Sequence, residues 1–176
     1  MISPNEACIA GGAKFTCQIN RRDSHHAGVV RDEHGEVRWR YCLRKNDLGR
    51  GWKNPFKTKD FVVANPRTGE ELIFRRGSFF PSRFTILDAR DEIGVVCLTS
   101  LLRNKYTINV KGRQPWTFRM PLFTVRFWGG TDQSPEFWVI VGPSKMEWNI
   151  LIKPALEDQP LVASLSFIHH QWWNYS

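Results

Sequence analysis

The chain of 176 residues carries 25 Lys and Arg against 17 Asp and Glu, a net charge of +8, and 41% of its residues are hydrophobic. This length suits one domain with a substantial core, and the scattered charges argue against an integral membrane protein. The N-terminus lacks the basic and apolar regions of a secretory signal, so we expect a cytoplasmic location. The four cysteines, at positions 8, 17, 42 and 97, show no metal-binding spacing, and we expect them to be reduced thiols.

The first 35 residues are expected to form an N-terminal segment that is partly loop. Within it, only residues 14–19 have the apolar alternation of a short strand. Residues 36–176 are expected to form the single domain of the protein. We place this boundary where the alternation of apolar and polar residues along the sequence becomes regular.

From Glu36 onward, apolar residues recur at every second position, as in half-buried β-strands. Asn, Pro and Gly mark turns between these runs and predict hairpins over residues 61–74, 83–101, 104–120 and 123–141. The second hairpin is expected to turn over residues 89–94. The apolar faces of four runs are Val37, Trp39, Tyr41 and Leu43; Tyr106, Ile108 and Val110; Trp116, Phe118 and Met120; and Met146, Trp148, Ile150 and Ile152.

The closing stretch, residues 161–173, has the composition of a helix that is apolar on nearly every side. No charged residue occurs between Gln159 and Ser176. Such a helix belongs in a core, and at about 1.5 Å per residue it is too short to cross a bilayer, which needs about 20 apolar residues. We expect His169 and His170 to reach water or backbone carbonyls where this helix ends.

These elements predict a mainly β fold, a closed antiparallel β-barrel of about 10–12 strands around a buried C-terminal helix. Regular short strands joined by hairpin turns are typical of a barrel or a sandwich. A sheet closed around the helix removes exposed edge strands and buries the apolar helix at the same time. A filled interior leaves no cavity for a small apolar ligand.

One strand-turn-strand pattern carries a family resemblance. Phe84, Ile86 and Asp88 are followed by Ile93 and Gly94. With the repeated hairpins and the closing helix, this pattern makes residues 36–173 similar to the tubby C-terminal-like superfamily, which includes tubby, the phospholipid scramblases and the LURP-one-related proteins, the last being nearest in size. The resemblance implies a barrel threaded by its C-terminal segment and, because tubby is a phosphoinositide-binding module, binding of anionic lipid headgroups.

Motifs for catalysis are absent from the sequence. It contains no phosphate-binding loop and no nucleophile elbow. Cys42 and Cys97 lie within strand patterns, where small buried hydrophobic residues are the expected interpretation. We therefore expect a protein that is not an enzyme and that uses no cofactor and no metal.

The strongest local signal is basic. Residues 44–59 carry six Lys and Arg against a single Asp. Such side chains collect phosphate groups, and aromatic residues among them serve as anchors in the headgroup layer of a membrane. The phosphate-binding candidates are Arg44, Lys45, Arg50, Lys53, Lys57, Lys59, Arg75 and Arg76, with Arg83 as a further addition if the hairpins bring it alongside, and the membrane-anchor candidates are Trp52 and Phe56. A solvated loop whose Trp52 caps the barrel is the alternative interpretation.

Three functions follow from these observations. The first is a non-catalytic, tubby-like barrel, peripheral to the membrane, that binds anionic phospholipid headgroups through the basic loop. The second is a structural scaffold that interacts with protein partners. The third, which we rank lower, is binding of single-stranded nucleic acid, with Trp52, Phe56 and Tyr41 as stacking platforms.

Overall fold

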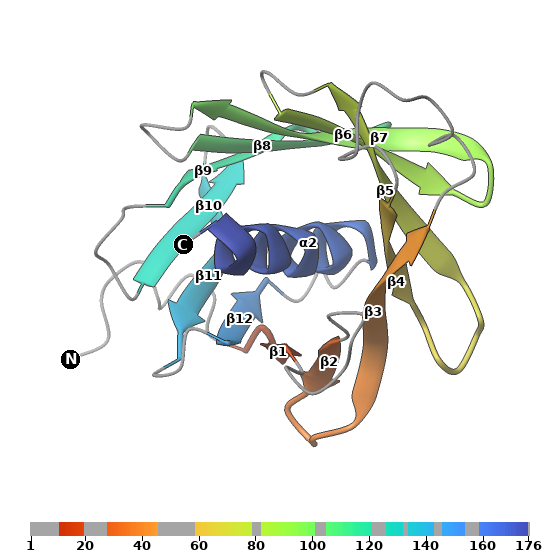
Figure 1. Cartoon of the computed structure of the whole chain (residues 1–176). Coiled ribbons are helices and arrows are strands. Elements are labelled where there is room, and N and C mark those ends of the chain that lie inside the picture. The colour runs from red at the N-terminus through yellow and green to blue at the C-terminus, as the bar shows by residue number, and fades with distance from the viewer. Residues whose placement is uncertain are drawn as a thin grey trace.

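The computed structural model describes nine stretches of the chain, residues 11–19, 28–45, 59–78, 82–100, 105–120, 126–131, 134–142, 146–153 and 159–175. Twelve antiparallel strands form a closed barrel around one helix, α2 (Gln159–Tyr175) (Figure 1). The predicted mainly β barrel with a buried C-terminal helix is therefore confirmed.

The strands follow one another around the barrel in chain order, so each pairs with its sequence neighbours. Short connections of this kind are typical of an antiparallel meander. The strands are β1 (Ala13–Ile19), β2 (Gly28–Asp32), β3 (Val37–Lys45), β4 (Lys59–Ala64), β5 (Glu71–Ser78), β6 (Ser82–Asp88), β7 (Asp91–Ser100), β8 (Lys105–Val110), β9 (Trp116–Arg119), β10 (Arg126–Thr131), β11 (Ser134–Val141) and β12 (Glu147–Ile152).

The first strand closes the barrel. On one side, β1 pairs with β12 through partners such as Phe15 and Ile150, and on the other it pairs with β2. The barrel therefore begins at Ala13 and not at Glu36, which corrects the expected boundary between an N-terminal segment and the domain. The boundary was misplaced because β2 has only two consecutive apolar residues, Val29 and Val30, and no visible alternation.

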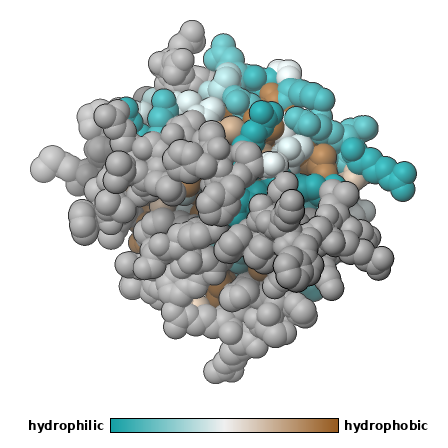
Figure 2. Space-filling view, turned by 45° about the horizontal axis from the view of Figure 1, so that its top comes forward, coloured by the Kyte–Doolittle hydropathy of each residue, from teal (hydrophilic) through white to brown (hydrophobic). Residues whose placement is uncertain are grey.

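Side chains alternate between the inside and the outside of the barrel, as the sequence predicted. The inward residues of β3, β8, β9 and β12 join one continuous core with the helix. On the face shown in Figure 2, the described surface is mostly hydrophilic, with apolar residues in small areas between hydrophilic ones. The predicted inward positions found buried are Trp39, Tyr41, Tyr106, Ile108, Val110, Trp116, Phe118, Met120, Trp148, Ile150 and Ile152.

The turn between β6 and β7 is tighter than predicted. The strands extend to Asp88 and resume at Asp91, so only Ala89 and Arg90 connect them, and Ala89 adopts a positive φ of 54°. Beyond this turn, the backbones of β7 and β8 lie so close together that glycine is needed at position 94. A Cβ there would lie 2.3 Å from the backbone oxygen of Asn109. This contact explains why glycine follows Ile93 in the pattern Ile93-Gly94.

The helix α2 runs through the middle of the barrel (Figure 1). It has 17 residues, two more at each end than predicted, and at about 1.5 Å per residue it is roughly 25 Å long. All ten residues from Leu161 to His170 are buried. The ring of Phe167 contacts those of Phe61, Phe74 and Phe84, which come from three adjacent strands, at centroid distances of 5.2, 4.8 and 4.6 Å.

The polar side chains of α2 are also buried. The hydroxyls of Ser164 and Ser166 donate to the carbonyl oxygens of Pro160 and Val162, four residues earlier, at 2.7 and 2.8 Å. These bonds satisfy the hydroxyls within the helix itself, so they can face an apolar wall. His169 and His170 are 0% and 2% exposed, so neither reaches water, and that part of the expectation is wrong. The helix extends past them to Tyr175, which places both imidazoles inside the barrel.

Candidate functional site

The basic segment begins and ends at two paired strands. Lys45 at the end of β3 is the register partner of Lys59 at the start of β4, so both ends of the segment lie at one rim of the barrel. The candidates Arg50, Trp52, Lys53, Phe56 and Lys57 lie in residues 46–58, outside the described residues.

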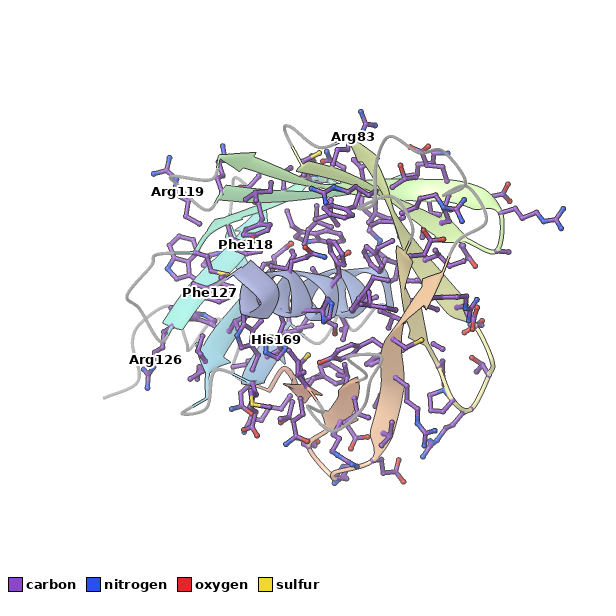
Figure 3. The ribbon with its side chains drawn as sticks, in the orientation of Figure 1. Arg83, Phe118, Arg119, Arg126, Phe127 and His169 are labelled. Carbon is purple, nitrogen blue, oxygen red and sulfur yellow. The ribbon has the colours of Figure 1, made fainter. Side chains whose placement is uncertain are left out.

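Two further basic residues reach the same rim through the next hairpins. Phe61 pairs with Phe74, and the antiparallel register continued by two residues puts Arg76 opposite Lys59. Arg83 on β6 pairs with Ser78 on β5, and its side chain is exposed and points away from the barrel (Figure 3). We call Lys45, Lys59, Arg76 and Arg83 the basic rim. The hairpins thus bring Arg76 and Arg83 to the end of the barrel from which the basic segment leaves.

Arg76 has a different setting from the other candidates. Its guanidinium carbon lies 5.5 Å from the centre of the Phe84 ring, which is a cation–π distance. The residue is half-buried, because it alternates with Arg75 and so faces the inner side of β5. Its charge therefore lies over the aromatic core at the mouth of the barrel.

Arg44 and Arg75 point to the outer face and form ion pairs within the protein. Arg44 donates two hydrogen bonds to Glu71, at 2.9 and 2.6 Å, and these bonds lower the pKa of the Glu71 carboxyl. Arg75 donates to Asp60 at 2.7 Å, and the hydrogen bond raises the pKa of Arg75. The Asp60 side chain is only 6% exposed. Both guanidinium groups are therefore engaged by the protein's own carboxylates, which separates them from the basic rim.

Aromatic and imidazole rings fill the interior around the end of α2. His169 stacks on Trp148 at 4.6 Å, and His170 lies 5.0 Å from the ring of Phe61. In Figure 3, Phe118, Phe127 and His169 lie between the strands and the helix axis. The helix occupies the space that an internal ligand would need.

Tyr41 belongs to this interior and not to the surface. It is 1% exposed, and its hydroxyl donates to the backbone oxygen of Gln18 at 2.8 Å. Burial raises its pKa well above the usual value. Tyr41 is thus inaccessible to a nucleic-acid base, which corrects its proposed role as a stacking platform.

The cysteines differ from the expectation in their positions. Cys42 and Cys97 are partly exposed on the outer faces of β3 and β7, so the prediction that they are small buried residues is wrong. Cys17 is the buried thiol, and it lies 3.4 Å from the Ser166 hydroxyl of α2. Burial raises the pKa of Cys17 to about 12, so the thiol stays protonated near neutral pH. Within the described stretches, no three His, Cys, Asp or Glu side chains are grouped as a metal site would require.

One surface feature was missed by the sequence analysis. Trp128 on β10 and Ile140 on β11 are 50% and 37% exposed, and both face outward. The signal was present, because residues 137–141 are apolar on both faces of the strand. Only one of those faces can point to the helix, so the other must lie on the surface.

Comparison with protein-family models, curated proteins and solved structures finds no match. Among the described residues, no helix combines the length and apolar character needed to span a bilayer. Inferences about function therefore rest on the fold and on the arrangement of the side chains.

Proposed function

We propose that this protein is a non-catalytic barrel of the tubby-like type that binds anionic phospholipid headgroups through the basic rim and the basic residues of segment 45–59. The observation that carries the proposal is the register of β3 to β6, which gathers Lys45, Lys59, Arg76 and Arg83 at one end of the barrel. The tubby-like resemblance supports the same ligand class. A barrel filled by its own helix presents its binding residues on the outside.

The number of charges sets the expected affinity. Each Lys or Arg near an anionic membrane contributes about 1 kcal/mol. The four residues of the basic rim would then give about 4 kcal/mol, a dissociation constant near 1 mM. Arg50, Lys53 and Lys57 would raise the total to about 7 kcal/mol, or roughly 10 μM. Binding of this strength depends on salt, because the charges act through a screened field.

Co-sedimentation with liposomes tests the proposal. We expect recovery with vesicles of phosphatidylcholine containing phosphoinositide and little recovery with phosphatidylcholine alone. The double variant Lys59→Gln, Arg83→Gln should bind about thirtyfold more weakly, because it loses about 2 kcal/mol. Arg90→Gln, in the β6–β7 turn at the other end of the barrel, is the matched control and should bind like the wild type. Equal recovery with both kinds of vesicle at low salt would rule the proposal out.

A scaffold function is the second candidate, and the exposed Trp128 and Ile140 favour it. Nucleic-acid binding ranks below both, because Tyr41 is buried. A titration with a single-stranded oligonucleotide at 50 mM salt tests this possibility: because affinity for a nucleic acid is high at low salt, the absence of binding there would exclude it.

A further inference from the structure

Four apolar residues form a continuous strip across the outer face of β10, β11 and β12. Trp128 is the register partner of Trp138, which pairs in turn with Leu151. Ile140 lies two residues further along β11, on the same face as Trp138. The two indole rings are 6.3 Å apart. We call Trp128, Trp138, Ile140 and Leu151 the apolar strip.

The strip is exposed to a degree that needs an explanation. Trp128 and Ile140 are the only large hydrophobic side chains found exposed in the described part of the chain. Single exposed apolar residues are ordinary, but a contiguous group on adjacent strands marks an interaction surface. Trp and Ile in such a group supply large contact areas at little cost in side-chain entropy.

Basic residues border the strip on the side of β9. Phe118 pairs with Gly129, so the antiparallel register puts Arg119 opposite Trp128. Lys105 on β8 pairs with Arg119, and Arg126 pairs with Ile140. Arg119 and Arg126 are exposed and point away from the barrel (Figure 3). One side of the strip is therefore positively charged.

A groove of about 990 Å³ borders the strip on the side of β1. Ile140 and Leu151 belong to both the strip and the groove, so the two are continuous. The turn between β2 and β3 forms its far wall. The polar lining of the groove includes Lys14, Arg31, Asp32, Glu33, Glu147 and Asn149. Carboxylates, cations and neutral groups are thus mixed there, and its volume accommodates several side chains of a partner.

This distribution of charge identifies one kind of partner. A bilayer or a nucleic acid carries phosphates along its whole length, so on this surface it would also bring them against Glu33 and Glu147 in the groove, which repel them. A second copy of this chain carries a net charge of +8, so long-range repulsion opposes its approach to Arg119 and Arg126. A peptide segment can instead place acidic residues over the arginines, bulky apolar residues over the strip and polar groups in the groove.

We propose that the apolar strip, its bordering arginines and the adjoining groove form a docking surface for an acidic peptide segment that carries bulky apolar side chains. This surface goes beyond the proposed headgroup binding, because its strip lies on β10 to β12 and its groove extends over β1 to the β2–β3 turn, whereas the basic rim lies on β3 to β6, with Lys45 at the end of β3 away from that turn.

The proposal can be tested by selecting binders from a library of random 12-residue peptides displayed on phage. The selected peptides are then synthesised, and their affinities are measured by fluorescence anisotropy. We expect selected peptides with at least two acidic and two bulky apolar residues. The double variant Trp128→Thr, Ile140→Thr should bind them at least tenfold more weakly, because the apolar contacts are lost. Arg119→Gln should bind them about threefold more weakly and should lessen the salt dependence.

Val95→Thr, an apolar-to-threonine change on the outer face of β7, is the matched control and should bind like the wild type. Threonine suits a strand, so melting temperatures within about 4 °C of the wild type are expected for a surface change of this kind. The proposal would be overturned if the selected peptides lacked acidic residues or if the selection enriched no peptide. It would also be overturned if the double variant bound the peptides as tightly as the wild type. The proposal would also be overturned if no peptide bound and the double variant instead lost binding to vesicles, to an oligonucleotide or to other copies of the chain.

Discussion

The substitution Phe167→Ala tests whether α2 is the centre of the fold. Phe167 is 1% exposed, and its ring contacts three phenylalanines from β4, β5 and β6. Removal of a buried Phe side chain costs about 3–5 kcal/mol, and the cost is highest where the cavity cannot collapse. Because a closed barrel holds the surrounding strands apart, we expect about 4–5 kcal/mol.

This loss is a large part of the stability of an ordinary domain, which is about 5–15 kcal/mol. At about 2–4 °C per kcal/mol for a chain of this size, the melting temperature should fall by about 8–20 °C. Phe167→Leu fills most of the space and should cost only about 1–2 kcal/mol. Urea unfolding followed by tryptophan fluorescence measures both values.

Thr107→Ala on the outer face of β8 provides the control, and a change of about 0.5 kcal/mol or less is expected. A cost below about 1 kcal/mol for Phe167→Ala would show that the helix does not fill the barrel. The proposed binding at the rim would then lose its basis, since a barrel that the helix does not fill has room for a ligand inside.

Three further predictions concern single side chains. Arg75→Met removes the ion pair and the hydrogen bonds that Arg75 gives to the buried Asp60 carboxylate and should cost about 2–4 kcal/mol in urea unfolding, whereas Arg44→Gln breaks a half-exposed pair and should cost about 1 kcal/mol or less. In native protein treated with iodoacetamide, mass spectrometry should find Cys17 unlabelled until urea is added, because its thiol is buried and protonated; rapid labelling without urea would contradict the structure. Burial raises the pKa of Tyr106 to about 12 from an unfolded value of 10, so its contribution to stability is complete below pH 10 and is lost between pH 10 and 12. The loss should amount to about 2–3 kcal/mol, and Tyr106→Phe should show a correspondingly smaller decline over that range.

The parts of the fold that the sequence predicted are those with a regular period. The alternation in residues 145–153 placed Trp148, Ile150 and Ile152 correctly on the inside of β12. The uncharged closing stretch likewise identified the core helix, because only a buried helix can be apolar on all sides. Both predictions depend on local pattern alone.

The parts that the sequence did not predict depend on contacts between distant segments. The five residues of β2 are too short and too weakly patterned to be recognised, yet the barrel closes only if β1 and β2 join β12 to β3. His169 and His170 were expected at the end of the helix, but their burial depends on rings from distant strands: His169 stacks on Trp148, and the ring of His170 lies tilted against that of Phe61. No local period contains that information.

The candidate site also has features that the sequence predicted and features that it did not. Composition identified the basic segment but grouped Arg44 and Arg75 with the other cations. Their ion pairs with Glu71 and Asp60 follow from which strands are neighbours and from which side chains face outward. The apolar strip was overlooked because the sequence analysis assigned one apolar face to each strand. Residues 137–141, apolar on both faces, required a second surface.

The basic rim and the apolar strip lie on opposite sides of the barrel, so whether the two sites bind independently can be tested. In the closed order of twelve strands, β4 and β10 are six positions apart in either direction, so the basic rim and the apolar strip face away from each other. Effects of substitutions at such distant sites add. If both proposals hold, Trp128→Thr with Ile140→Thr leaves vesicle binding unchanged, and Lys59→Gln with Arg83→Gln leaves peptide binding unchanged. Vesicles should then pull down the labelled peptide only when the wild-type protein is present, because one barrel holds both. Competition between vesicle and peptide would instead mean that they share a single surface, and the separate assignments would be wrong.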